Sequence, residues 1–148
     1  MLKGLNPLLT PDVLYALCAM GHGDEVVIVD AHYPADVAAR SSVYGKLLRM
    51  DGVAVPQTVR AVLSVLNLDT FFDRPAEWME VDGMPDEVPA VQRDAQIEVD
   101  RAAGRAQMFA AVPRQIFYER AKKAYCVVIT GEARRWGGFI FRKKVDLG

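Results

Sequence analysis

The chain has 148 residues, and its 18 Lys and Arg residues nearly balance 19 Asp and Glu residues, for a formal net charge of −1 at pH 7. This length suits one ordinary domain, and a hydrophobic fraction of 51% is enough for a substantial core, which argues against disorder. The charge argues against a protein that coats nucleic acid, because neutralising phosphates requires a cationic face. We expect a single domain over residues 1–148 that binds no nucleic acid.

Neither an export signal nor a membrane span is indicated. Prolines interrupt the N-terminal segment before an apolar signal core could form. The most apolar runs, at 26–29 and 124–129, are far shorter than the roughly 20 residues needed to cross a bilayer. Cys18 and Cys126 have neither metal-binding spacing nor the density of a disulfide scaffold, and we expect two buried thiols. A cytoplasmic protein without a membrane partner is predicted.

The first predicted elements are a helix and a buried strand. Thr10-Pro11-Asp12 supplies an N-cap, a first-turn proline and an acidic first turn, and apolar residues then recur at helical spacing up to Gly21. Residues 25–30 are apolar on both alternating faces and rich in β-branched side chains. That pattern is typical of a strand covered on both sides.

The rest of the chain alternates between strand and helix patterns. In chain order we expect a strand at 52–55, an amphipathic helix at 59–66 closed by Asn67, a strand at 78–81, a turn at 82–86, a helix at 91–102 closed by Gly104, a strand at 108–112, a helix at 114–123, a second two-sided strand at 124–130 and a closing strand at 138–142. Pairing of the last two strands across residues 131–137 would make the sheet mixed. The fold class predicted is α/β: a three-layer α/β/α sandwich with a mixed central sheet.

Both histidines of the chain flank the first predicted strand. His22 and Asp24 precede it, and Asp30 and His32 follow it, in mirrored order. Imidazole can take or give a proton near physiological pH, and a carboxylate can orient it or hold a hydroxyl group. His22 between two glycines is therefore a candidate catalytic residue. A surface or helix-capping histidine is the competing interpretation.

Two other kinds of site are disfavoured by the same segment. A strand rises about 3.3 Å per residue, so histidines at its opposite ends are too far apart to share one metal ion. Gly21-His22-Gly23 lacks the lysine of a phosphate loop, and it lies between a helix and a strand in the reverse of the order that a dinucleotide fingerprint needs. We expect neither a metal nor a nucleotide cofactor.

Four blocks of the sequence carry a resemblance to a known family. They are Met20-Gly21-His22-Gly23-Asp24-Glu25, Asp30-Ala31-His32-Tyr33-Pro34, Phe117-Tyr118-Glu119-Arg120-Ala121 with Lys123-Ala124, and Ile129-Thr130-Gly131-Glu132. In order and separation they resemble the sugar mutarotases that include L-fucose mutarotase and D-ribose pyranase, from Leu5 almost to the C-terminus. The E-R-A-x-K-A pattern at residues 119–124 favours the fucose branch.

The resemblance implies interconversion of the α and β anomers of a free pyranose, without a cofactor. It implies His22 as the catalytic acid–base group. The residues that it implies for binding the sugar are Asp30, Arg114, Trp136, Gly137 and Gly138. Gly138 stands where relatives commonly have Asn, a departure that concerns the choice of sugar more than the reaction. Possible supporting residues are Asp24, His32 and Tyr118.

Several of these residues have simpler interpretations. Arg114 could be a solvated first-turn arginine, and Trp136 a core or interface aromatic. Lys122-Lys123 with Arg134-Arg135 is most simply a solvated basic face. Tyr118 could pack against the core, or its phenol could serve as a second acid–base group.

The resemblance also implies a ring-shaped homo-oligomer, a decamer in the family, with pockets near subunit boundaries. Phe71-Phe72 and Trp78-Met79 are candidates for that interface, with core packing as an equal explanation. The main alternative function is a non-catalytic sugar-binding or transport-accessory protein. A metal-dependent hydrolase ranks last.

Overall fold

One six-stranded sheet organises the chain. The computed structural model describes residues 2–69, 74–106 and 109–145, and its strands follow the order β2-β5-β1-β6-β3-β4. In chain order the elements are α1 (Pro11–Ala19), β1 (Glu25–Val29), α2 (Ala35–Ser41), β2 (Leu47–Met50), α3 (Val55–Leu63), β3 (Ala76–Met79), α4 (Ala90–Ala103), β4 (Ala110–Val112), α5 (Arg114–Lys123), β5 (Cys126–Thr130) and β6 (Phe139–Arg142).

The sheet is mixed, as predicted, but the predicted pairing of its last two strands is wrong. β1 lies between them: Val27 is in register with Val127 of β5 in a parallel pair and with Ile140 of β6 in an antiparallel pair. β6 is also antiparallel to β3, whereas β2 is parallel to β5 and β3 is parallel to β4. The other five strands therefore end at the same edge of the sheet, which we call the carboxyl edge.

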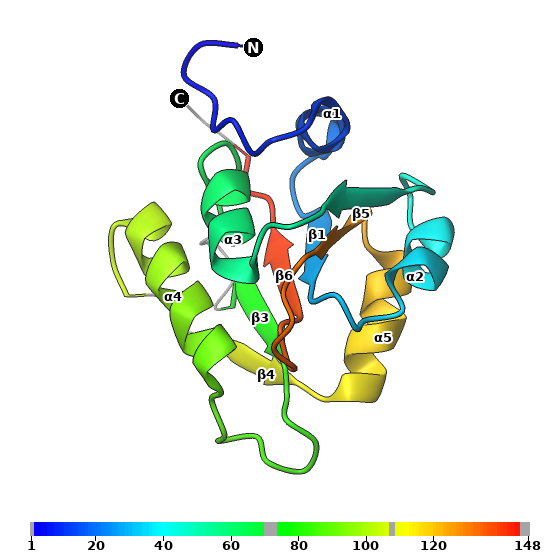
Figure 1. Ribbon diagram of the computed structural model, residues 1–148, viewed down its shortest axis with the longest axis vertical. Helices are drawn as coiled ribbons and strands as arrows, with labels where there is room; N and C mark the ends of the chain where they lie inside the picture. Colours follow the sequence, from blue (N-terminus) through cyan, green and yellow to red (C-terminus); the bar gives the residue numbers. More distant parts are fainter. Residues whose placement is uncertain (1, 70–73, 107–108, 146–148) are drawn as a thin grey trace.

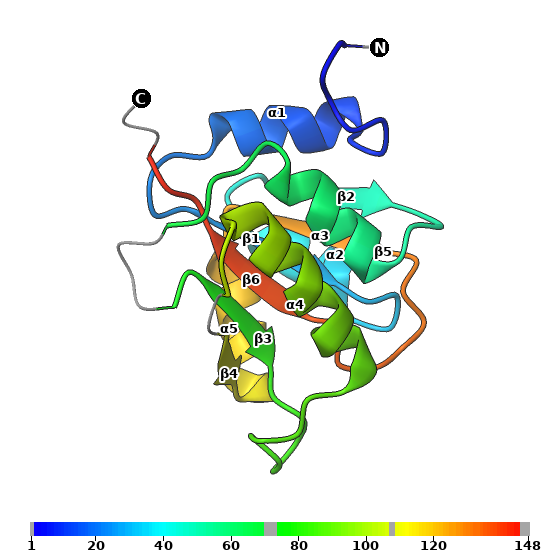
Figure 2. The same ribbon diagram turned by 90° about the vertical axis from the view of Figure 1, so that its left-hand side faces the viewer.

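Two helical layers cover the sheet and confirm the three-layer α/β/α sandwich (Figures 1 and 2). Because successive side chains of a strand point to opposite faces, Val26 and Ile28 pack into one core cluster while Val27 and Val29 pack into another. The first cluster includes side chains of α1, α3 and α4, and the second includes side chains of α2 and α5. Both faces of β1 are thus buried, as its sequence indicated.

The structure differs from the predicted elements between residues 35 and 55. Helix α2 and strand β2 were not predicted, and the strand predicted at 52–55 is wrong. β2 has four residues and an exposed Arg49, so its apolar signal is short and broken. Val55 instead begins α3, because Pro56 in the first helical turn is compatible with a helix start. The helix at 114–123 has the predicted bounds.

The remaining predictions have mixed outcomes. Cys126 is buried, and burial raises the pKa of its thiol to about 12, but Cys18 is exposed on α1. Trp78 is a core residue whose ring stacks on Phe109 at 4.3 Å between centroids, and Met79 is also buried. Phe71-Phe72 lies outside the described residues.

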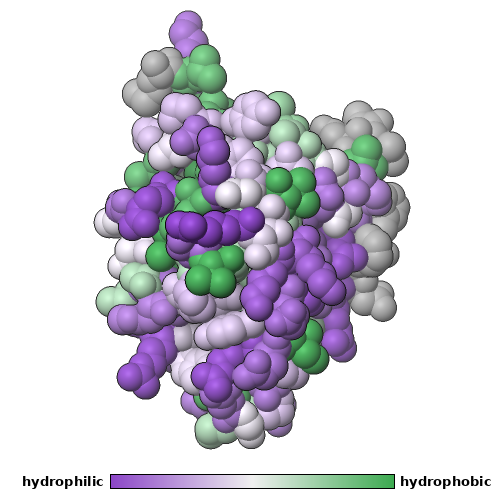
Figure 3. All heavy atoms as spheres, turned by 90° about the vertical axis from the view of Figure 1, so that its right-hand side faces the viewer, coloured by the Kyte–Doolittle hydropathy of each residue, from purple (hydrophilic) through white to green (hydrophobic). Residues whose placement is uncertain are grey.

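The outer surface over α2 and α5 is largely polar, with separated hydrophobic groups (Figure 3). Val37, Val43 and Ile116 are among the exposed apolar residues of these segments. None of the helices in the described ranges combines the length and apolarity that a bilayer span requires.

Candidate functional site

Chemically reactive side chains gather at the carboxyl edge, where they line a pocket of about 340 Å³. We call this the edge pocket. It is lined by Asp30, His32, Tyr33, Met79, Asp82, Arg114, Tyr118, Arg135 and Trp136. Open α/β sheets bind ligands at the carboxyl ends of their strands, because loops from several strands converge there. A larger hollow of about 700 Å³ beside α1 is lined mainly by Leu and Pro side chains, and its lining includes no Asp, Glu, His, Lys or Arg.

Asp30, directly after β1, has a carboxylate held by two backbone amides. Its Oδ1 accepts a hydrogen bond of 3.0 Å from the His32 N–H, and its Oδ2 accepts one of 3.0 Å from the Gly137 N–H. The first contact is the local turn that Asp commonly forms with the residue two positions later. The side chain is almost fully buried, so these contacts fix its orientation at the floor of the edge pocket.

His32 fastens the loop between β5 and β6. Its Nε2 lies 2.9 Å from the carbonyl oxygen of Ala133. A carbonyl can only accept, so Nε2 carries the proton and the neutral ring has Nδ1 as its acceptor. His32 thereby connects the segment after β1 to the loop that carries Trp136.

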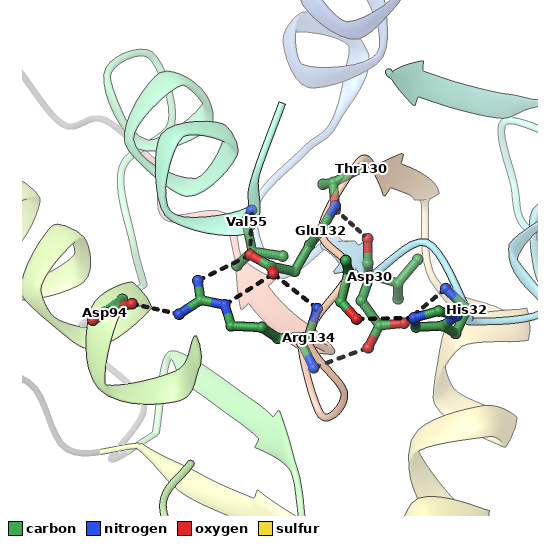
Figure 4. A network of polar contacts seen from close by, with 10 residues as sticks. Asp30, His32, Val55, Asp94, Thr130, Glu132 and Arg134 are labelled. Carbon is green, nitrogen blue, oxygen red and sulfur yellow. Dashed lines mark hydrogen bonds and ion pairs between the residues drawn. The ribbon is translucent and has the colours of Figure 1, made fainter. Parts of the chain in front are cut away.

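Glu132 and Arg134 form the ionic centre of this loop (Figure 4). Glu132 is buried and accepts hydrogen bonds from the Val55 N–H at 3.3 Å and from the Arg134 Nε at 2.9 Å. Arg134 also donates to Asp94 of α4 at 2.7 Å. The hydrogen bond from the Arg134 guanidinium lowers the pKa of the Glu132 carboxyl. Arg134 is exposed, as expected for a solvated basic face, but it is also ion-paired with Glu132 and Asp94.

Trp136 has a left-handed backbone, with φ of 70°. Non-glycine residues seldom adopt this conformation, because Cβ then crowds the backbone. The next residue, Gly137, donates its N–H to Asp30, and the Trp136 carbonyl accepts a hydrogen bond of 3.1 Å from Gln92 Nε2. Contacts on both sides of Trp136 thus hold its indole at the wall of the edge pocket.

Helix α5 contributes Arg114 and Tyr118 from one helical face. They are four residues apart, so their side chains lie one turn above each other. The Nε of Arg114 lies 3.3 Å from Asp82 Oδ1, while the ring of Tyr118 meets that of Tyr33 edge-on at 5.0 Å between centroids. Burial raises the pKa of the Tyr33 phenol, and the charges of Tyr118 and Glu119 add to the effect. Arg114 is half-exposed and can turn toward a ligand.

His22 and Asp24 lie at the opposite edge of the sheet. The five residues of β1 intervene, and at about 3.3 Å per residue the strand alone spans roughly 16 Å. His22 Nδ1 accepts a hydrogen bond of 3.2 Å from the Val145 N–H, and it lies 3.6 Å from Oδ2 of the buried Asp69. Asp24 Oδ2 accepts from the Gly21 N–H at 2.7 Å. Within the described ranges, no three His, Cys, Asp or Glu side chains gather as metal ligands.

One chain therefore brings together only part of the predicted site. Asp30, His32, Arg114, Tyr118 and Trp136 line the edge pocket, and Gly137 contacts Asp30, whereas His22 and Asp24 are remote. The residues that sequence reasoning missed in the pocket are Tyr33, Met79, Asp82 and Arg135. Asp82 had a detectable signal, since it is a carboxylate in a turn after a predicted strand.

Gly138 packs against the core at the base of this loop. A Cβ there would lie 3.0 Å from Cζ of the buried Phe117 and 3.4 Å from Cε of Met79. A side chain at this position requires the Phe117 ring to shift by a few tenths of an ångström, because 3.0 Å is shorter than nine in ten Cβ contacts in proteins. The absence of the expected Asn thus accompanies tight packing between the start of β6 and α5.

Residues 3–146 match the RbsD / FucU transport protein family. The human protein named fucose mutarotase is 43% identical over 148 residues, which cover 97% of this chain and 94% of the human one. The crystal structure of the fucose mutarotase of Streptococcus pneumoniae in complex with L-fucose superposes with a TM-score of 0.87 at 34% identity, covering 99% of this chain and all of that one.

A more distant structure shares the fold alone. Bacillus subtilis RbsD complexed with D-ribose has a TM-score of 0.72 and 18% identity, covering 99% of this chain and all of that one. The sequence is thus less similar to this RbsD than to the two proteins named for fucose. The higher identity to the proteins named for fucose agrees with the pattern at residues 119–124, which favours the fucose branch.

Proposed function

Because the chain belongs to the RbsD / FucU transport protein family, we propose that it is a sugar mutarotase, an isomerase that interconverts the α and β anomers of a free pyranose. L-fucose or a related sugar is the proposed substrate, in line with the names of the relatives. The observation that carries the proposal is the edge pocket, where a fixed carboxylate, a guanidinium and an indole face one space. These are groups that hold sugar hydroxyls and stack on the C–H face of a sugar ring.

Anomer exchange needs only proton transfer. A base removes the O1 proton while an acid protonates the ring oxygen, the C1–O5 bond breaks, and the open aldehyde recloses on its other face. Asp30 accepts from sugar hydroxyls with its oriented carboxylate, Arg114 donates to a hydroxyl or the ring oxygen, and Trp136 supplies the flat wall. Tyr118 is a second phenol at the pocket that can relay a proton.

The proton-transfer role of His22 requires a second subunit. The edge pocket lies at the end of β1, whereas the His22 imidazole lies before the start of that strand. His22 can therefore act only on a sugar bound to a neighbouring copy of the chain. A head-to-tail ring meets this requirement. In such a ring, the carboxyl edge of each subunit faces the opposite edge of its neighbour, which carries His22. The decameric ring implied by the family resemblance is one such assembly.

The test is exchange NMR on free sugars with the His22→Ala variant. We expect anomer exchange to slow by about 10²- to 10⁴-fold, the usual contribution of a positioned acid–base group. Far-UV circular dichroism and urea unfolding must first show that the fold is intact. Lys3→Ala, an exposed change at the same end of the chain, is the control and should exchange at the wild-type rate. Wild-type turnover in His22→Ala would exclude the role.

The same experiment separates the second candidate, a sugar-binding protein without turnover, which fits the name of the RbsD / FucU transport protein family. If wild-type protein shifts sugar resonances without accelerating exchange, that function replaces the mutarotase. A panel that includes L-fucose and D-ribose assigns the substrate, because a difference of a few hydroxyl contacts decides between pyranoses.

A further inference from the structure

Among the described residues of α4, Gln92 is the one uncharged polar residue whose side chain is wholly buried. This side chain faces the carboxyl edge. Its Nε2 donates two hydrogen bonds, at 2.8 Å to the Met79 carbonyl and at 3.1 Å to the Trp136 carbonyl. Both acceptors belong to residues that line the edge pocket. A single amide group therefore connects the end of β3 to the loop between β5 and β6.

The orientation of this amide is fixed by its partners. Carbonyl oxygens can only accept, so the NH₂ group must face them and the Oε1 atom must point away. Oε1 is buried and has no hydrogen-bond partner in the described structure. A buried acceptor without a partner is unfavourable, and such groups in a folded protein call for a functional or structural reason. The two donated bonds provide that reason here.

Trp136 needs such an anchor because of its backbone. Its φ of 70° is disfavoured for a residue with a side chain, so the peptide would relax without external contacts. The Gly137 N–H to Asp30 holds one side of the residue, and Gln92 holds the carbonyl of Trp136 itself. Loss of the Gln92 bond would let the indole leave the wall of the edge pocket.

We infer that Gln92 is a positioning residue that sets the place of the Trp136 indole in the edge pocket, and thereby the affinity of the pocket for a sugar; the second part rests on the proposed function. Gln92 does not line the pocket and acts only through Trp136. An interaction made equally with the bound sugar and the transition state changes KM and leaves kcat nearly unchanged.

The experiment is a double-mutant cycle with Gln92→Met and Trp136→Ala. Methionine keeps the length of the side chain and removes both donors. We expect Gln92→Met to raise the KM for the sugar by about fivefold or more with kcat within about twofold, and to have almost no further effect in the Trp136→Ala background, because residues that act as one unit are not additive. Full additivity of the two changes would overturn the inference. So would an unchanged KM in a folded Gln92→Met protein.

Two further measurements keep the inference testable independently of turnover. In a Trp78→Phe background the only indole is Trp136, and we expect its fluorescence emission to shift in Gln92→Met but not in the matched control Gln57→Met, a surface position on α3. An unshifted emission overturns the inference. A shift together with absence of exchange in wild-type protein supports the positioning role and rejects the mutarotase function.

Should Gln92→Met not fold, Gln92→Glu serves in its place. The introduced carboxyl group can donate one hydrogen bond to a carbonyl while it is protonated, whereas its ionised form repels both carbonyls. We expect the KM of that variant to rise with pH relative to wild type. A constant ratio across the pH range would overturn the inference, because a merely structural defect would not follow the carboxyl titration.

Discussion

Two buried carboxylates at the carboxyl edge are held in different ways. Asp30 accepts from two backbone amides, so neutral donors orient it. Glu132 accepts from the Val55 amide and from the Arg134 guanidinium, so it depends on a charge. Hydrogen bonds to a charged partner are stronger than those to a neutral one. Glu132 should therefore contribute more to stability, while Asp30 remains available to a ligand.

Replacing Glu132 with Gln tests that assignment. We expect the free energy of unfolding at pH 7 to fall by about 1–3 kcal/mol, because Arg134 and the Val55 amide lose a charged acceptor in a buried place. Urea unfolding measures the change. Glu119→Gln is the control, since the exposed Glu119–Lys122 pair is worth about 0–1 kcal/mol at most. Equal stabilities of wild type and Glu132→Gln would contradict the assignment.

The same residue predicts a dependence on pH. The folded-state pKa of Glu132 is depressed below its unfolded value of about 4.3, so its contribution is complete above that value and disappears as pH falls through the folded pKa. The difference in unfolding free energy between wild type and Glu132→Gln should therefore shrink over the acid range below about pH 4.3, the unfolded pKa. A difference that stays constant over this range would show that the charge of Glu132 is not what stabilises the loop.

At the scale of elements, α5 joins the scaffold to the site. Its first turn carries Arg114, and its last turns carry Arg120, which pairs with Glu25 of β1 and Glu77 of β3. The arginine of the E-R-A-x-K-A pattern thus binds the helix to two strands, away from the edge pocket. The pattern favoured the fucose branch, but its arginine holds the scaffold together and does not line the edge pocket.

Local patterns predicted the two buried strands and α5 but missed α2 and β2, and they predicted long-range structure poorly. The two-sided apolar strands at Val26–Val29 and Val127–Ile129 and the full extent of α5 followed from composition and periodicity. The insertion of β1 between β5 and β6 is a long-range pairing that no local pattern encodes. For the same reason Asp82 and Trp136 could be noted separately, but not placed in one pocket.

The close packing of the loop after β5 against the turn before α3 predicts an effect on stability. A Cβ on Gly131, at the end of β5, would lie 2.8 Å from the backbone nitrogen of Gly52 in the turn before α3. Backbone atoms cannot rotate away, so Gly131→Ala should lower the unfolding free energy by about 2–3 kcal/mol, as overpacking does. Gly45→Ala is the comparison, because nothing lies within 4 Å there and only its positive φ adds about 1–2 kcal/mol. Urea unfolding in which Gly131→Ala is the more stable variant would contradict the predicted clash.

For the whole molecule, the direction of the strands decides where chemistry can occur. Five strands end at the carboxyl edge and bring Asp30, Arg114 and Trp136 together, whereas His22 precedes β1 and is left at the other edge. The mirrored order of residues around β1 therefore marks two edges of the sheet. A catalytic role for His22 and a sugar site beside Asp30 are compatible only when subunits meet edge to edge.

Subunit mixing tests this arrangement. His22→Ala and Arg114→Ala are each expected to be nearly inactive, but in randomly mixed oligomers about a quarter of the shared sites combine an intact His22 from one subunit with an intact Arg114 from another. Exchange NMR on co-refolded mixtures should therefore recover about a quarter of the wild-type rate. Asp30→Ala mixed with Arg114→Ala is the matched control and should recover nothing, because both residues lie in one pocket of one chain. A site shared between subunits would be excluded if activity returned in the control mixture. It would also be excluded if no activity returned when His22→Ala and Arg114→Ala subunits had co-assembled.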